Sequence, residues 1–168
     1  MASTTQPELE ERWRFPAVVI YDDAVTAYET SDNFVLCRTM DIRAGQRGRF
    51  ARSRLVDSTG RLWHLDGAKV ANGVGPLWGW RLFSRCVRAS PVVVRGPEPA
   101  DLGSIRQDLI RLVRFRASFV VVVRSFCATM SGREVSRLIP RLESAATVSD
   151  LVFVLLGGDF PERERILR

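Results

Sequence analysis

The sequence predicts an α+β fold, in which an N-terminal antiparallel sheet is followed by a helical C-terminal half packed on one face. Residues 13–95 contain short β-branched and aromatic runs, which favour strands. Residues 96–99, Gly-Pro-Glu-Pro, then indicate a boundary between secondary-structure elements. Residues 101–158 carry apolar side chains at spacings of three and four, as amphipathic helices do. Because strands and helices are segregated, we expect a hairpin meander of about four to six strands.

The chain of 168 residues suits one domain with a sizeable core. We place this domain at 13–158, with residues 13–95 mostly strands and 101–158 mostly helices. Residues 1–12 are polar and are expected to form a flexible leader. Residues 159–168 are expected to form a charged tail.

The first predicted elements are a strand pair and a short helix. Residues 17–21, Ala-Val-Val-Ile-Tyr, favour a strand, and residues 25–28 return as its hairpin partner after an Asp-Asp turn. Ser31 or Asp32 is a candidate N-cap for a short helix over 33–38.

The central element is a hairpin within residues 50–71. Asp57-Ser58-Thr59-Gly60 places Asp first and Gly fourth, the residues that a type I turn favours at these positions. Residues 82–89 and 92–94 follow as strands, and Pro91 between them favours a bend or an edge strand.

Three helices are predicted after the Gly-Pro break. The apolar stripe within 102–113 marks the first. Candidates for its N-cap are Asp101 and Ser104. A second stripe spans 135–142 behind a capping box at 131–134, and Pro140 should kink or shorten it. The third helix covers 150–156. Candidates for its N-cap are Thr147 and Ser149.

Residues 119–123, Phe followed by four valines, leave strand and helix both open. Runs of this length are too short to span a membrane, and we see no secretory signal. Three well-separated cysteines indicate free thiols in a reducing compartment. We therefore expect a cytoplasmic protein with no membrane partner.

Positive charge concentrates in the predicted sheet. The chain carries +6, and residues 43–95 hold 11 basic and 2 acidic groups. Guanidinium groups bind carboxylate or phosphate in pairs, so this region predicts an anionic partner. A solvated polar face in an arginine-rich chain explains the pattern equally well. The predicted partner-binding residues are Arg47, Arg49, Arg52, Arg54 and Arg61, with Trp78 and Trp80 as anchors.

No pattern in the sequence predicts a metal site or another cofactor. Zinc sites need several closely spaced ligands, whereas this chain has one histidine, His64, and scattered cysteines at Cys37, Cys86 and Cys127. Any catalytic Cys–His pair would have to form in space, so a small enzyme using them is only an alternative.

The order of short motifs resembles that of small bacterial immunity-type proteins of polymorphic or contact-delivered toxin systems. The resemblance covers roughly residues 15–157 and rests on VVIYDD, AVTAYET, MDI and LVDSTGRLWHL, followed by SGREVSRLIPRLESAATVSDLVFVLLG. It implies a non-enzymatic protein that binds and blocks a cognate toxin, and it transfers no catalytic residue. Because this chain is basic, the resemblance implies a toxin with an acidic contact surface.

We therefore expect an immunity-type binding protein whose preformed surface occludes its partner. Arginines would give orientation and on-rate, and aromatic anchors would give affinity. The alternative is a nucleic-acid-binding module using the basic sheet region, with affinity that falls steeply with salt. A homodimer formed along an exposed strand edge at 92–95 is compatible with these two functions and with the small enzyme.

Overall fold

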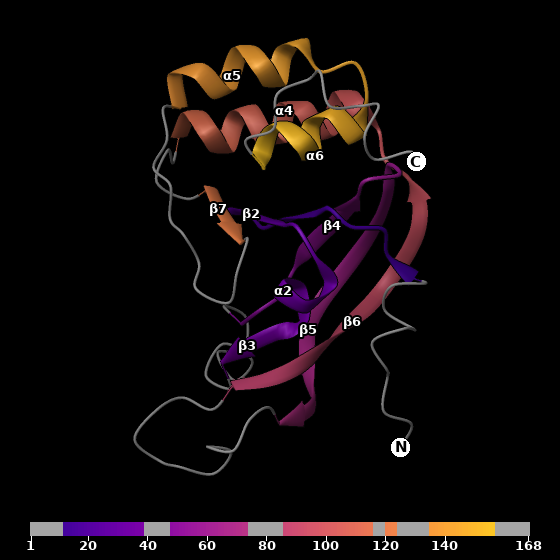
Figure 1. Ribbon diagram of the computed structural model, residues 1–168. Helices are drawn as coiled ribbons and strands as arrows, with labels where there is room; N and C mark the ends of the chain where they lie inside the picture. The colour runs from indigo at the N-terminus through magenta and orange to yellow at the C-terminus, as the bar shows by residue number, and fades with distance from the viewer. Residues whose placement is uncertain (1–11, 39–47, 74–85, 116–119, 124–134, 157–168) are drawn as a thin grey trace, which may run out of the picture.

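The computed structural model describes residues 12–38, 48–73, 86–115, 120–123 and 135–156. The fold is α+β, and strands precede most helices, as predicted (Figure 1). The elements are β1 (Ala17–Ile20), β2 (Val25–Tyr28), α2 (Ser31–Val35), β3 (Leu36–Arg38), β4 (Ser53–Asp57), β5 (Arg61–Gly73), β6 (Cys86–Pro99), α4 (Leu102–Phe115), β7 (Val120–Val123), α5 (Val135–Ser144) and α6 (Val148–Leu155).

The described strands form one sheet in the order β3-β6-β5-β4-β1-β2-β7. Its neighbours are antiparallel except for β2 and β7, which run parallel. Residues 120–123 are therefore a strand. The sheet is not a simple meander, because β3 pairs with β6 at the edge opposite β7.

The long strands β5 and β6 curve through several register shifts, as Figure 1 shows. β6 runs unbroken through Pro91, so of the two predicted alternatives the edge strand is the one that the structure has. The boundary predicted at 96–99 falls slightly later, because β6 includes these residues and ends at Pro99, before α4. Only residues 86–88 of β6 pair with β3. Beyond them β6 is an edge strand among the described residues, where a missing proline N–H is tolerated.

Each face of the sheet is covered by a different part of the chain. Val18 and Ile20 of β1 pack under α4, α5 and α6, whereas Ala17 and Val19 face an aromatic cluster that includes Trp13. All four β1 residues are buried, because alternate side chains of a strand point to opposite faces. Figure 1 shows the three helices together beyond one side of the sheet.

The aromatic cluster comes mostly from the N-terminal half and the central hairpin. Its rings meet edge-on or tilted, with centroids 4.7–6.4 Å apart, distances at which aromatic pairs attract. The rings in these contacts belong to Trp13, Phe15, Tyr28, Phe34, Phe50 and Trp63. The cluster therefore supplies a second core on the sheet face away from α4.

The helix caps follow local chemistry. The carboxylate of Asp101 accepts the Ser104 N–H at 2.7 Å at the start of α4. Thr147 and Asp150 form a capping box at α6. The helix predicted at 33–38 is wrong in extent, because α2 ends at Val35 and β3 follows. Thr30 caps α2 in place of the predicted residues.

The second C-terminal helix, α5, extends beyond the predicted stripe and has Pro140 inside it. The capping box predicted at 131–134 lies outside the described residues.

Candidate functional site

Arg49 is half-buried and contacts other parts of the domain. Its guanidinium donates to main-chain carbonyl oxygens at the end of α2, at 2.8 Å from Leu36 O and 3.2 Å from Asn33 O. It also lies 5.4 Å from the Tyr28 ring centroid and 5.0 Å from that of Phe50, within cation–π range. These contacts fix α2 against the aromatic cluster.

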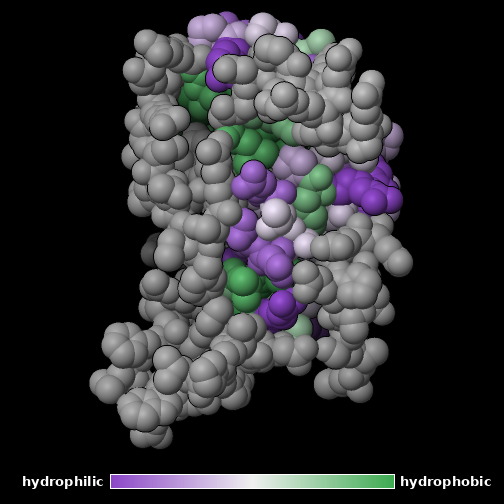
Figure 2. Space-filling view, in the orientation of Figure 1, coloured by the Kyte–Doolittle hydropathy of each residue, from purple (hydrophilic) through white to green (hydrophobic). Residues whose placement is uncertain are grey.

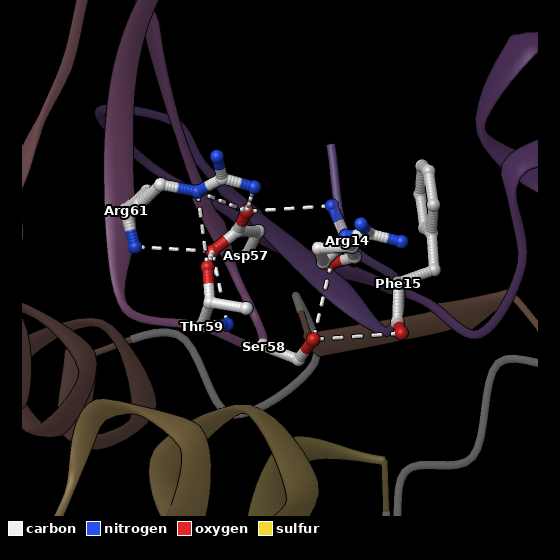
Figure 3. A network of polar contacts seen from close by, with 6 residues as sticks. All are labelled: Arg14, Phe15, Asp57, Ser58, Thr59 and Arg61. Atoms are coloured by element: carbon white, nitrogen blue, oxygen red, sulfur yellow. Dashed lines mark hydrogen bonds and ion pairs between the residues drawn. The ribbon is translucent and has the colours of Figure 1, made fainter. Parts of the chain in front are cut away.

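Arg61 is paired with a fully buried carboxylate, that of Asp57 at the hairpin turn. Figure 3 shows Asp57 between Arg61, Thr59 and the main chain of Arg14. Its oxygens accept the Thr59 and Arg61 N–H groups at 3.0 Å, the Thr59 hydroxyl at 2.7 Å and the Arg14 N–H at 3.3 Å. The Arg61 side chain adds Nε at 3.2 Å and Nη2 at 3.1 Å.

The Asp57 network joins the predicted turn to the start of the chain. The Ser58 hydroxyl extends it by donating to the Arg14 and Phe15 carbonyl oxygens at 3.3 and 3.5 Å (Figure 3). Asp57 therefore closes the hairpin and also holds the segment before β1.

Arg54 lies on the helical side of the sheet. Arg54 and Val56 are two residues apart in β4 and therefore lie on the same face, where Val56 packs under the helices. The Arg54 Nη2 lies 2.6 Å from an Asp108 oxygen of α4. Arg52 is exposed, and its backbone is in the left-handed region (φ 47°). Its main-chain N–H donates to the carboxylate of Asp66 at 3.5 Å.

The described arginines of the predicted set therefore do not share one face. Arg49 and Arg61 lie with the aromatic cluster, and Arg54 lies with the helices. Arg47, Trp78 and Trp80 lie outside the described residues. Binding of a partner by these residues stays a prediction.

A different set of charged side chains forms one row across three strands. Arg54 of β4 pairs in register with His64 of β5, which pairs with Arg95 of β6. Paired residues in antiparallel strands point to the same face, with Cβ atoms about 5 Å apart. These three residues are the centre of a larger set, which we call the cross-strand row.

Two carboxylates bridge the basic side chains of this row. Glu98 lies 2.9 Å from His64 Nε2 and 2.7 Å from Arg95 Nη2. Asp108 lies 2.6 Å from Arg54 and 3.5 Å from Arg111 of α4. The cross-strand row consists of Arg54, His64, Arg95, Glu98, Asp108 and Arg111.

The row carries a surplus of positive charge. Three arginines face two carboxylates, and protonation of His64 adds a further charge. The hydrogen bond from His64, with help from Arg95, holds the pKa of the Glu98 carboxyl below its usual value. Glu98 is therefore ionised at neutral pH and lies between His64 and Arg95.

The row is a surface feature. The side chains of Arg95 and Arg111 are 71% and 61% exposed. Figure 2 shows hydrophilic and hydrophobic side chains interleaved below the helices on the face that it presents. An exposed set of donors with excess positive charge can hold carboxylates or phosphates.

The geometry does not pair His64 with a described cysteine. Cys37 pairs in register with Val87 of β6, and His64 pairs with Arg95, eight residues further along the same strand. At about 3.3 Å per residue this separates them by roughly 26 Å along β6. Cys86 precedes Val87, so its backbone lies at the same distant end, and the third cysteine lies outside the described residues.

Among the described residues, no three His, Cys, Asp or Glu side chains are grouped as ligands for a metal ion. No described helix has both the length and the apolar character needed to span a bilayer.

Comparison of the chain with protein-family models, with curated proteins and with solved structures found no match.

The density of arginines along the sequence does not reveal the partners that decide which arginines are exposed. The turn at 57–60 fixes the hairpin register, so the pairing of Arg54 with His64 was available from the sequence. No local signal places Asp108 beside Arg54 or Glu98 beside His64, because these contacts span 54 and 34 residues.

Proposed function

We propose that this chain is a non-enzymatic, cytoplasmic binding protein of the bacterial immunity type, which binds and occludes a cognate toxin. The observation that carries the proposal is the positive surplus of the cross-strand row. An acidic surface on the toxin complements it, and complementary charge steers association and selects the partner.

The placement of the row on adjacent strands supports occlusion by a preformed surface. Arg54, His64 and Arg95 stand on three adjacent strands, and Asp108 ties the first of them to α4. Because the backbone of these strands is already ordered, binding a partner does not require it to be ordered anew. The β4–β5 hairpin supplies two of the three strands. Its turn carries the sequence DSTGR, which belongs to one of the motifs behind the resemblance to immunity proteins.

The test is co-expression with the product of the neighbouring gene. We expect that product to arrest growth alone, to be harmless together with this chain, and to co-purify with it. Neighbouring products that are harmless alone, or that do not co-purify, contradict the proposal.

Salt dependence identifies the class of partner. A protein complex steered by a few surface charges loses affinity moderately with salt. An affinity for single- or double-stranded nucleic acid that falls steeply with salt, without toxin binding, would show the alternative partner instead.

A further inference from the structure

We infer that the acidic partner docks on the cross-strand row at Val94, Arg95 and Arg111, and that its carboxylates engage these two arginines. This inference rests on the proposed function for the class of partner, an acidic protein segment. It adds the place of contact and the side chains that make it.

Val94 is the apolar part of this contact. Residues 93–95 of β6 lie opposite only His64 and Leu65 of β5, so Val94 is the extra residue of a bulge. It is 67% exposed, one of two large hydrophobic side chains that are exposed among the described residues. An exposed valine followed in the strand by the exposed Arg95 offers an apolar contact beside a charged one, the combination that interfaces use.

Arg95 and Arg111 retain donors for a partner. Each has one carboxylate contact within the described part of the chain, Arg95 with Glu98 and Arg111 with Asp108. A guanidinium carries five N–H donors, so both groups can donate to a second carboxylate in the forked geometry that arginine favours. Those internal pairs are partly exposed and therefore weak, so a partner can compete with them.

Contact through side chains fits this edge better than strand addition. β6 carries Pro91, Pro97 and Pro99, which have no N–H to offer another strand, and a bulge at Val94. These features protect an edge against pairing with another chain. We therefore place the partner on the row itself, in preference to a second copy of this chain along residues 92–95.

The neighbouring positions of the row fit one compact acidic segment. Adjacent strands are about 4.8 Å apart, so the backbones at Arg54 and Arg95 are separated by roughly 10 Å. That distance matches carboxylates about three residues apart on an extended segment. Arg111 joins the row at its Arg54 end, because Asp108 contacts both arginines.

The experiment titrates the full chain, labelled for NMR, with a peptide of alternating glutamate and alanine. We expect the largest shift changes at Val94, Arg95, His64 and Arg111. An oligonucleotide of equal net charge should bind more weakly. Changes centred on other exposed cations such as Arg14 or Arg52, or tighter binding of the oligonucleotide, would overturn the inference.

The double variant Arg95→Ala/Arg111→Ala should weaken peptide binding by roughly fivefold per arginine. The control, Lys69→Ala, removes one exposed cation outside the row and should change affinity less than about twofold. Equal weakening by both would overturn the inference, and unchanged melting temperatures show that the variants fold.

The inference and the proposed function fail separately. If the neighbouring toxin binds equally well to the double variant, the contact is elsewhere and the immunity function stands. If the peptide binds the row and no neighbouring product is toxic, the row is an acidic-segment site in a protein of another function.

Discussion

Replacing Asp57 with alanine should destabilise the domain more than any other single change of a carboxylate. Asp57 is fully buried and accepts from two side-chain groups and three main-chain N–H groups. Removing one partner of a buried ion pair costs about 3–5 kcal/mol. The Arg61 side chain is 39% exposed, so water partly replaces the lost carboxylate. We therefore expect a loss of about 3 kcal/mol, close to 6–12 °C in melting temperature.

The assay is urea unfolding followed by tryptophan fluorescence, with Asp66→Ala as the matched control. Asp66 lies in the same hairpin but is exposed, and its described contact with Arg52 N–H is 3.5 Å long. Its removal should change the free energy of unfolding by less than about 0.5 kcal/mol. A loss below about 1 kcal/mol for Asp57→Ala, or equal losses for both variants, would refute the reasoning.

Three further changes test other parts of the fold. Arg49→Ala should lower the unfolding free energy by about 2–3 kcal/mol, and Arg49→Lys should not restore it, because one ammonium cannot replace a fork donating to several carbonyls. Full stability of the lysine variant would contradict this role. Gly96→Ala places a Cβ 2.7 Å from a carbonyl oxygen at φ +119°, so it should cost more than about 2 kcal/mol, whereas Gly67→Ala, with open space, should cost about 1 kcal/mol. The reverse order in thermal melts would refute the packing described. Burial raises the pKa of both tyrosines, Tyr21 and Tyr28, so native absorbance at 295 nm should not rise near pH 10, where free tyrosine ionises. Because the pKa of each tyrosine is higher in the folded state than in the unfolded state, its contribution to stability is complete below about pH 10. That contribution falls as the pH rises further. Ordinary titration in the folded protein would contradict this burial.

The sequence predicted best the elements that short-range chemistry specifies. The turn at 57–60 lies where its Asp and Gly require, since Asp57 accepts the Thr59 N–H and Gly60 adopts φ +78°. The strands at 17–20 and 25–28 and the stripe of α4 follow their hydrophobic patterns. These features depend on neighbours only a few residues away.

Features that depend on distant partners were not predicted. Residues 36–38 leave the helical pattern of α2 because β6, about 50 residues later, offers them a strand partner. β6 continues through residues 96–99 as an edge strand, although the local pattern Gly-Pro-Glu-Pro is typical of a break.

The candidate site shows the same limit. Arginine density located the positive charge along the sequence, but the choice between an interior and an exposed guanidinium depends on tertiary partners. Arg49 meets the end of α2, and Arg54 meets α4. Arg111, which joins the cross-strand row, comes from a helix that the charge pattern did not single out.

The most direct test of the account is the dissociation constant of the complex with the neighbouring gene product, measured by calorimetry for the wild type and for Arg95→Ala/Arg111→Ala. We expect the double variant to bind roughly 25-fold more weakly, about fivefold for each arginine, with the difference shrinking at high salt. Equal affinities at low salt would contradict the claim that the cross-strand row holds an acidic partner.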